Sequence, residues 1–244
     1  MTDARELLER IAVGPLAALD DDIFAVHQAS DAHYDRMGWL YDAVCGTRAY
    51  NALVWNTTPS ISRDFARRVI DSREDGPHVE LGCGSLLFTA DLYARDRGRP
   101  CFLIDPSIAM LRMARRRLRS RSGAVPRHVV LVRGDSARLP VSLAFAATVL
   151  SMHVVHVVAD REGFIGQLAA LARPGDATVG LTSLVLTGAW RDVLLHGLHR
   201  TGELAPPLSE AELLAMLDRH LPGTLEIERS GQLALVTAAY DRAH

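Results

Sequence analysis

The segment HVELGCGS, from His78 to Ser85, places the strongest constraint on what this chain can fold into. A short apolar strand is predicted there, and its two glycines permit a sharp turn and a close approach of the backbone to a ligand. After a gap long enough for a helix, the apolar segment 101–104 ends in Asp105. This order of strand, glycine turn, helix and second strand is typical of the first half of a parallel α/β nucleotide-binding unit.

The same alternation continues toward the C-terminus, so we expect an α/β fold with helices on both faces of a mostly parallel sheet. Further strands are predicted at 129–133, 147–152 and 178–186, and helices at 86–94, 108–120 and 164–172. A capping pattern at 209–212 precedes an amphipathic helix that ends near residue 220. Segments 224–228 and 232–238 flank Ser230-Gly231, which predicts a terminal antiparallel hairpin.

Residues 1–77 have apolar residues near helical spacing and an aromatic-rich segment. We therefore divide the chain into a helical, substrate-binding lid over 1–77 and a core over 78–244. The break at Asp75-Gly76-Pro77 supports this boundary.

Composition excludes several classes of protein. The formal net charge is -2, so no overall field favours nucleic acid or membrane. No run approaches the roughly 18 apolar residues that cross a bilayer. The three cysteines are far apart and odd in number, which favours reduced thiols and a cytoplasmic location.

The glycine turn favours one kind of nucleotide over another. A dinucleotide site prefers a third glycine, but Leu86 follows Gly82 and Gly84, so pyrophosphate is disfavoured. Glu80, two residues before the first glycine, suits a ligand with an ammonium group, as in S-adenosylmethionine. An ordinary strand-to-helix turn is the alternative interpretation.

Two further acids follow predicted strands. Asp105 is placed to accept hydrogen bonds from both ribose hydroxyls, although Asp105-Pro106-Ser107 also reads as a helix cap. Asp135 in Gly134-Asp135-Ser136 is placed to accept from an adenine amino group, although Gly-Asp is also a common turn. Ligands of open α/β sheets bind at the carboxyl ends of the strands, where all three sites are expected.

Together these motifs resemble those of class I S-adenosylmethionine-dependent methyltransferases of the small-molecule type. Glu80-Leu-Gly82-Cys-Gly84 is similar to the first motif of that family, and Asp105-Pro-Ser-Ile-Ala-Met resembles its ribose motif and helix start. Gly134 to Pro140 resembles the adenine motif, and the segment 171–175 resembles the turn before the fifth strand. The resemblance implies a Rossmann-like, seven-stranded sheet and S-adenosyl-L-methionine as cofactor. The cofactor-binding residues that it indicates are Glu80, Gly82, Cys83, Gly84, Ser85, Leu86, Asp105, Pro106, Met110, Gly134, Asp135, Ser136, Ser151 and Met152.

The segment after the fourth strand supplies the candidate catalytic residues, His153 and His156. Histidine can remove a proton near neutral pH, and this segment resembles the histidine-bearing loop of small-molecule methyltransferases. A hydrogen-bonded structural role is the alternative for either residue. His196 and His199 lack an accompanying acidic cluster, so we expect no metal site.

Four aromatic residues are the candidates for the substrate site: Tyr34, Tyr41, Trp55 and Trp190. Aromatic faces attract a sulfonium by cation–π contact. For aromatic residues of the N-terminal segment, packing in a helical cap is the alternative.

We therefore expect an enzyme that transfers a methyl group to a small organic acceptor. Arginine without lysine suggests a GC-rich genome and thereby natural-product biosynthesis. One alternative is a methyltransferase-like enzyme that uses the bound cofactor for another reaction, such as a cyclisation. A second is an RNA methyltransferase that uses arginines 112–121, although we expect that run to be a solvated helix face and expect no nucleic-acid partner. A homodimer is consistent with the sequence but not indicated by it.

Overall fold

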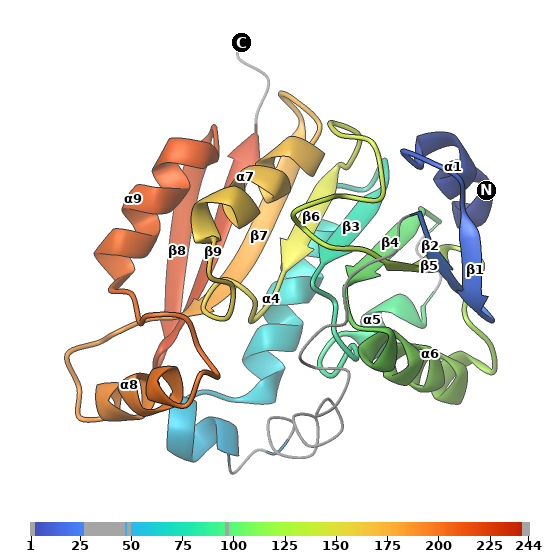
Figure 1. Ribbon diagram of the computed structural model, residues 1–244. Helices are drawn as coiled ribbons and strands as arrows, with labels where there is room; N and C mark the ends of the chain where they lie inside the picture. Colours follow the sequence, from blue (N-terminus) through green and yellow to red (C-terminus); the bar gives the residue numbers. More distant parts are fainter. Residues whose placement is uncertain (1–2, 27–46, 48–49, 96–97, 241–244) are drawn as a thin grey trace.

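The computed structural model describes residues 3–26, 47, 50–95 and 98–240. Its strands are β1 (Ala17–Asp20), β2 (Ile23–Ala25), β3 (His78–Leu81), β4 (Cys101–Asp105), β5 (Val129–Arg133), β6 (Thr148–Ser151), β7 (Ala177–Leu184), β8 (Thr224–Ser230) and β9 (Leu233–Tyr240). They form one nine-stranded sheet in the order β1-β2-β5-β4-β3-β6-β7-β9-β8 (Figure 1).

The centre of the sheet is parallel and its end is antiparallel. Strand β3 pairs in parallel with β4 and β6, while β9 runs antiparallel between β7 and β8. The predicted α/β fold with a terminal hairpin is thus confirmed. Since parallel strands end on the same edge of a sheet, the carboxyl ends of β3, β4 and β6 lie side by side.

Helices cover both faces of this sheet. They are α1 (Ala4–Ile11), the π-helical turn η1 (Asn51–Trp55), α4 (Pro59–Asp71), α5 (Ala90–Tyr93), α6 (Ile108–Ser122), α7 (Arg161–Leu171), α8 (Asp192–Arg200) and α9 (Glu210–His220). Buried residues of α1, α7 and α9 pack on one face, and those of α4, α5 and α6 pack on the other. No helix in the described part of the chain has both the length and the apolarity needed to cross a bilayer.

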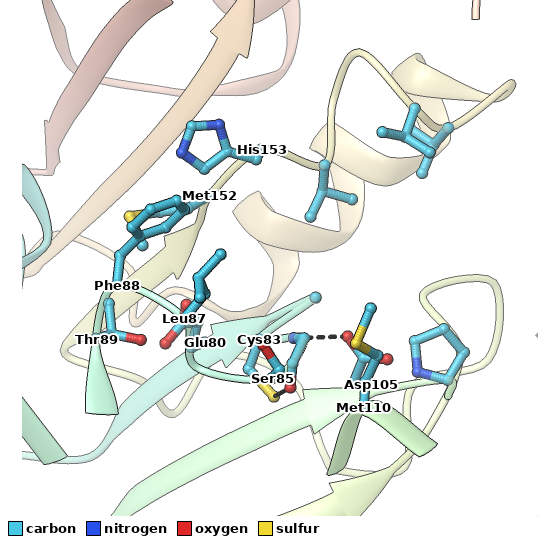
Figure 2. A pocket seen from close by; sticks show the side chains of 16 residues that line it. Glu80, Cys83, Ser85, Leu87, Phe88, Thr89, Asp105, Met110, Met152 and His153 are labelled. Atoms are coloured by element: carbon cyan, nitrogen blue, oxygen red, sulfur yellow. Dashed lines mark hydrogen bonds between the residues drawn. The ribbon is translucent and has the colours of Figure 1, made fainter. Parts of the chain in front are cut away.

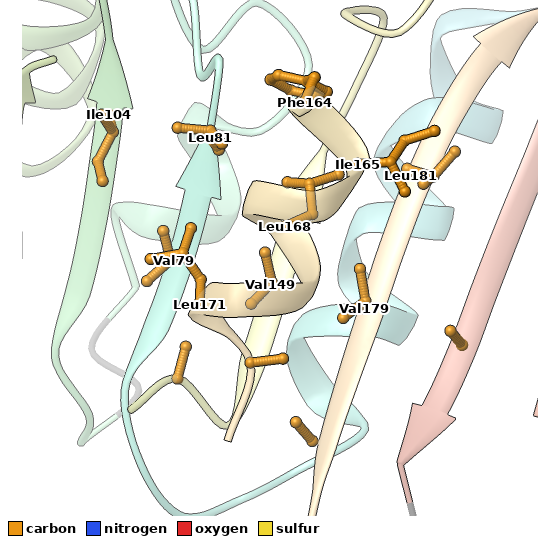
Figure 3. Packing of buried hydrophobic residues seen from close by; sticks show 14 of the residues in the cluster. Val79, Leu81, Ile104, Val149, Phe164, Ile165, Leu168, Leu171, Val179 and Leu181 are labelled. Carbon is orange, nitrogen blue, oxygen red and sulfur yellow. The ribbon is translucent and has the colours of Figure 1, made fainter. Parts of the chain in front are cut away.

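The strand pattern explains this two-sided burial. Successive side chains of a strand point to opposite faces, so Val79 and Leu81 face α7 while His78 and Glu80 face the α5 side. Figure 3 shows Val79, Leu81 and Val149 against the inward side chains of α7, among them Leu168. The chemically important polar residues of β3 therefore lie on the face opposite α7.

The N-terminal segment differs from the helical prediction. Strands β1 and β2 form a hairpin, and β2 pairs in parallel with β5 through Ile23 and Leu131. These two strands extend the expected seven-stranded sheet to nine. Such short apolar segments look alike in helix and strand patterns, so sequence periodicity could not identify them. The division of the chain at residue 77 remains a prediction.

The helix predicted at 86–94 is also shorter than expected. The regular helix α5 spans only Ala90–Tyr93, because Leu86 has a left-handed backbone with φ 58°. By contrast, α9 begins with the predicted capping box, in which Ser209 and Glu212 bond reciprocally to each other's backbone.

Candidate functional site

The glycine turn after β3 is held by the end of β4. The backbone N–H groups of Gly82 and Cys83 both donate to the carbonyl of Ile104, at 2.8 and 3.1 Å. Gly82 and Gly84 have φ values of 77° and 54°, in the left-handed region that favours glycine. The chain therefore turns sharply at this point and exposes backbone at the strand ends.

Asp105 connects this turn to the following helix. Its Oδ2 atom accepts from the Gly84 N–H at 2.8 Å, and Oδ1 accepts from the Ser107 N–H at 2.9 Å. The carboxyl is buried, with 7% of the residue exposed. The helix-cap interpretation of Asp105 is thus partly correct, while Ser107 itself caps α6 by accepting from Met110.

Glu80 is a buried carboxyl beside Asp105. Only 2% of it is exposed, and its Oε2 atom accepts a 2.6 Å hydrogen bond from the Tyr93 hydroxyl. Burial raises the pKa of Glu80 to about 8, with a further increase from the Asp105 charge; the hydrogen bonds from Tyr93 and Thr89 act in the opposite direction. Near neutral pH this carboxyl can therefore change its protonation state.

A cavity of about 200 Å³ lies over these strand ends, large enough for an organic ligand. Figure 2 shows the side chains that line it. The lining residues predicted from the sequence are Glu80, Gly82, Cys83, Gly84, Ser85, Asp105, Pro106, Met110, Met152 and His153. Most of the remaining lining is apolar, with Leu87, Phe88, Thr89, Val154, Val157 and Val158.

His153 lies at the wall of this cavity, in the segment after β6. Its Nε2 atom is 3.0 Å from the Ser62 hydroxyl on α4, and its backbone N–H donates to Thr182 at 2.9 Å. Its backbone is left-handed, with φ 59°. Burial lowers the pKa of the imidazole to about 4, so the ring is neutral at pH 7.

The sequence of the core matches a known family. Residues 79–179 match the family model described as a methyltransferase domain. This part of the chain is a methyltransferase domain. A search of curated proteins found no match to the chain.

Solved structures support the same fold for the methyltransferase. The [4+2]-cyclase SpnF has a TM-score of 0.65 and 16% identity, over 86% of this chain and 94% of the cyclase. A Haloferax volcanii complex of the Trm112 methyltransferase activator with a methyltransferase has a TM-score of 0.62 and 17% identity, over 88% of this chain and 100% of that chain. Geranyl diphosphate methyltransferase with GPP and sinefungin has a TM-score of 0.57 and 16% identity, over 75% of this chain and 78% of that chain. At these identities the likeness establishes the fold alone.

Six of the predicted cofactor-binding and catalytic residues do not line the cavity: Leu86, Gly134, Asp135, Ser136, Ser151 and His156. Leu86 is 1% exposed and packs in the core, and the Ser151 side chain is buried. Asp135 caps its own turn by accepting from the Ala137 N–H at 2.9 Å. Contacts of the first five residues with the cofactor, and a catalytic role of His156, remain predictions.

His156 makes a hydrogen bond of the kind expected from its alternative, structural interpretation. Its Nδ1 atom accepts a 3.1 Å hydrogen bond from the backbone N–H of Leu184. Burial, with smaller effects of His153 and Arg161, lowers its pKa to about 3. Through this hydrogen bond the buried, neutral ring of His156 connects the segment after β6 to the end of β7.

Two of the four aromatic candidates are not among the lining residues of this cavity, and the other two lie outside the residues that the structure describes. Tyr34 and Tyr41 lie outside the described residues. Trp55 makes an edge contact with Tyr50, with ring centroids 5.7 Å apart. Trp190 is 69% exposed and carries Arg191 over its ring at 4.7 Å. Their roles toward a substrate remain predictions.

Sequence reasoning missed Ser62 and the apolar wall. Ser62 belongs to no motif, and only the packing of α4 on the sheet brings it to His153. The segment from Val154 to Val158 did carry a signal, since four valines around a histidine are unusual for an exposed loop. In the described part of the chain, no group of three or more His, Cys, Asp or Glu side chains could hold a metal ion.

Proposed function

We propose that this methyltransferase transfers the methyl group of S-adenosylmethionine to a small, partly apolar acceptor, with His153 as the general base. The observation that carries the proposal is the position of His153 on the wall of the cavity that holds the two strand-end carboxyls, Glu80 and Asp105. A cofactor group and an acceptor bound in one cavity would be held in reacting geometry.

The cavity residues fit the cofactor chemically. Two buried carboxyls suit a ligand with one ammonium group and one pair of ribose hydroxyls, and no arginine lies among the lining residues to bind a phosphate. In this proposal Glu80 receives the ammonium group and Asp105 the ribose. Gly82 to Ser85 approach the methionine portion, with Met110 and Pro106 beside the nucleoside. Gly134 to Ser136 contact the adenine, and Ser151 and Met152 approach from β6.

When bound, S-adenosylmethionine supplies an electrophilic methyl group on a sulfonium. His153 would then take the proton of the attacking hydroxyl or amine. Because Nε2 is engaged by Ser62, Nδ1 is the nitrogen assigned to receive that proton. The Ser62 hydroxyl would accept from Nε2–H and so stabilise the imidazolium as it forms. A neutral imidazole at pH 7 has the lone pair that this step requires.

The apolar part of the lining indicates the acceptor class. Phe88, Val154, Val157 and Val158 present hydrocarbon next to His153. Burying an apolar portion of the acceptor against them would orient its nucleophilic atom toward the imidazole. We place the acceptor among small apolar molecules with one hydroxyl or amine, as in natural-product biosynthesis in the cytoplasm.

The RNA alternative is disfavoured by the pairing of the arginine face. Asp20 accepts from Arg112 and Arg115, each at 2.9 Å, and Asp22 accepts from Arg119 at 2.8 Å. These aspartates sit in the β1–β2 hairpin beside α6. Paired arginines release fewer counterions on contact with phosphate than free ones, so they contribute less affinity.

Two measurements test the proposal. Calorimetry with S-adenosylhomocysteine should show binding, and Asp105→Ala should weaken it while the exposed Arg119→Gln should not. Incubation with S-adenosylmethionine and a panel of small phenols and amines should then release S-adenosylhomocysteine and a methylated product. Absence of binding would end the cofactor assignment. A new product without S-adenosylhomocysteine would instead identify a cyclase-like reaction.

A further inference from the structure

A line of buried polar side chains runs away from the cavity, beneath Glu80, on the α5 face of the sheet. Its members come from β3, α5, β6 and the segment before β4, and each is at most 5% exposed. In order of contact they are Glu80, Tyr93, His78, Thr148 and Arg99. Only Glu80 lines the cavity, so ligand contact explains none of the other four.

The distances in this line are those of strong hydrogen bonds. Arg99 contacts the Thr148 hydroxyl at 2.6 Å, and the same hydroxyl lies 2.8 Å from Nδ1 of His78. Nε2 of His78 lies 2.8 Å from the Tyr93 hydroxyl, which donates to Glu80 at 2.6 Å. His78 and Thr148 are direct register partners on adjacent strands, so the sheet itself holds them together.

The chemistry of the Arg99 end determines the direction of every hydrogen bond. A guanidinium only donates, so the Thr148 oxygen accepts from Arg99. The single hydroxyl proton of Thr148 then points to Nδ1 of His78, because its hydroxyl contacts only these two groups among the described hydrogen bonds. His78 consequently carries its proton on Nε2 and donates it to the Tyr93 oxygen.

Tyr93 is thereby left with one direction in which to donate. Its oxygen accepts from His78, so its own proton must point to Oε2 of Glu80. When Glu80 is itself protonated, that proton lies on the other oxygen, Oε1. Glu80 thus has a permanent donor in both of its protonation states.

We propose that Arg99, Thr148, His78 and Tyr93 form a one-directional hydrogen-bond relay that prepares Glu80 to give up a proton when a cationic cofactor binds. These four are positioning residues, since none of them lines the cavity. The part of the proposal that concerns the cofactor rests on the proposed function. The direction of the relay does not.

The relay acts against the other influences on Glu80. Burial and the Asp105 charge raise the pKa of Glu80, whereas the Tyr93 and Thr89 hydrogen bonds lower it, giving about 8. The ionisable groups next to Glu80 are Asp105 at the end of β4, Cys83 in the glycine turn and Tyr93 on α5. The relay connects Glu80 further to His78 and Arg99. The His128 ring contacts the backbone carbonyl of Tyr93. Without the Tyr93 donor, Glu80 would hold its proton to higher pH.

The first experiment measures the direction of the relay without any ligand. Nitrogen-15 NMR distinguishes the two neutral tautomers of histidine and its cation. The wild-type protein should show His78 as a single neutral tautomer with the proton on Nε2 between pH 6 and 8, assigned through the signal lost in His78→Gln and perturbed in Thr148→Val. Protonation of Nδ1 in the wild type would overturn the relay.

The second experiment measures proton release on binding of S-adenosylhomocysteine at pH 8, by calorimetry in buffers of different ionisation enthalpy. A group near its pKa is half protonated, so the wild type should release about half a proton. Glu80→Gln gives the number of protons that are released when Glu80 cannot take part. Tyr93→Phe removes the donor to Glu80. Thr148→Val lets His78 adopt the other tautomer, in which Nε2 accepts and competes with Glu80 for the Tyr93 proton. Both variants should therefore release closer to one proton.

Thr178→Val is the matched control, since Thr178 is buried and pairs with Thr148 across the β6–β7 register. Thr178→Val should release as many protons as the wild type. Arg99 keeps its bond to the Ile70 carbonyl at 2.8 Å in Thr148→Val, which favours a folded variant, and a thermal melt checks this. Equal release by Thr148→Val and Thr178→Val would overturn the relay beyond Tyr93. Failure of the wild type to bind would overturn the proposed function instead, and the NMR result would still decide the relay.

Discussion

The Nε2 atom of His153 lies 3.0 Å from the Oγ atom of Ser62, across 91 positions of the chain. Ser62 is on α4, and His153 follows β6 with a left-handed backbone. Non-glycine residues in that region are uncommon and are held there by their surroundings. The bonds of His153 to Ser62 and Thr182 supply such a restraint. The imidazole is therefore held in place before any ligand arrives.

Replacing His153 by alanine should lower kcat by about 10²- to 10⁴-fold, the usual contribution of a general base. Affinity for S-adenosylhomocysteine should change little, because that ligand carries no proton for the base. Ser62→Ala should cause a smaller loss of kcat, and Ser60→Ala, an exposed hydroxyl on the same helix, should cause none. Steady-state kinetics with an acceptor that the enzyme methylates checks the series. Full activity in His153→Ala would remove the base from the mechanism.

The rate should also show how strongly His153 resists protonation. Its pKa is lowered to about 4, so the ring stays neutral from pH 8 down to about pH 5. We expect kcat to be level over that range and to fall as pH approaches 4, where the base becomes protonated. A pH–rate profile on the enzyme–acceptor complex tests this. A decline centred near 6.5, the ordinary pKa of histidine, would contradict the lowered pKa of this ring.

Asp105→Ala should damage both the glycine turn and the ligand site. Two backbone N–H groups, of Gly84 and Ser107, lose their acceptor. Hydrogen bonds to a charged group are worth about 1.5–3 kcal/mol, so affinity for S-adenosylhomocysteine should fall at least about tenfold. Calorimetry gives the affinity and thermal unfolding the stability. Asp91→Ala, an exposed acid on α5, is the control and should bind normally.

The two glycines of the turn should respond differently to alanine. A Cβ at Gly82 would lie 2.5 Å from Val154, whereas a Cβ at Gly84 would meet no atom within 4 Å. Gly84→Ala should lower the free energy of unfolding by about 1–2 kcal/mol, the penalty of a left-handed backbone alone. Gly82→Ala should cost about 1–3 kcal/mol more, through overpacking, and should displace the loop that carries His153. Chemical unfolding measures both. Equal losses would mean that the loop yields to the added methyl group.

His156 should make the folded protein sensitive to acid. Its folded pKa is about 3, while an unfolded histidine titrates near 6.5, so the unfolded state binds the extra proton between these values. The free energy of unfolding should therefore decrease as pH falls below 6.5, by about 1.4 kcal/mol per pH unit for this residue. His153 adds a change of the same sign. Urea unfolding between pH 4 and 7 should show a shallower slope in His156→Gln than in the wild type.

Local signals predicted the core of the fold and most of the residues that line the cavity. Glu80, Gly82, Gly84 and Asp105 stand at fixed distances from strand ends, and parallel strands bring their carboxyl ends together whatever the rest of the chain does. The short strands β1 and β2 escaped because three or four apolar residues do not distinguish a strand from a helix. Their identity depends on an edge of the sheet, at β5, that the local sequence does not contain.

By itself the sequence determined the α/β class, the methyltransferase motifs and the presence of two carboxyls at the strand ends. Those features depend on strand periodicity and on residues close to one another along the chain. Only the tertiary structure decided that His153 meets Ser62, that His156 is buried on the backbone of β7, and that His78 and Tyr93 connect Arg99 to Glu80. Each of those contacts joins segments brought together by packing and strand register. The direction of a hydrogen bond also depends on all the partners of its donor, which no local pattern of residues records.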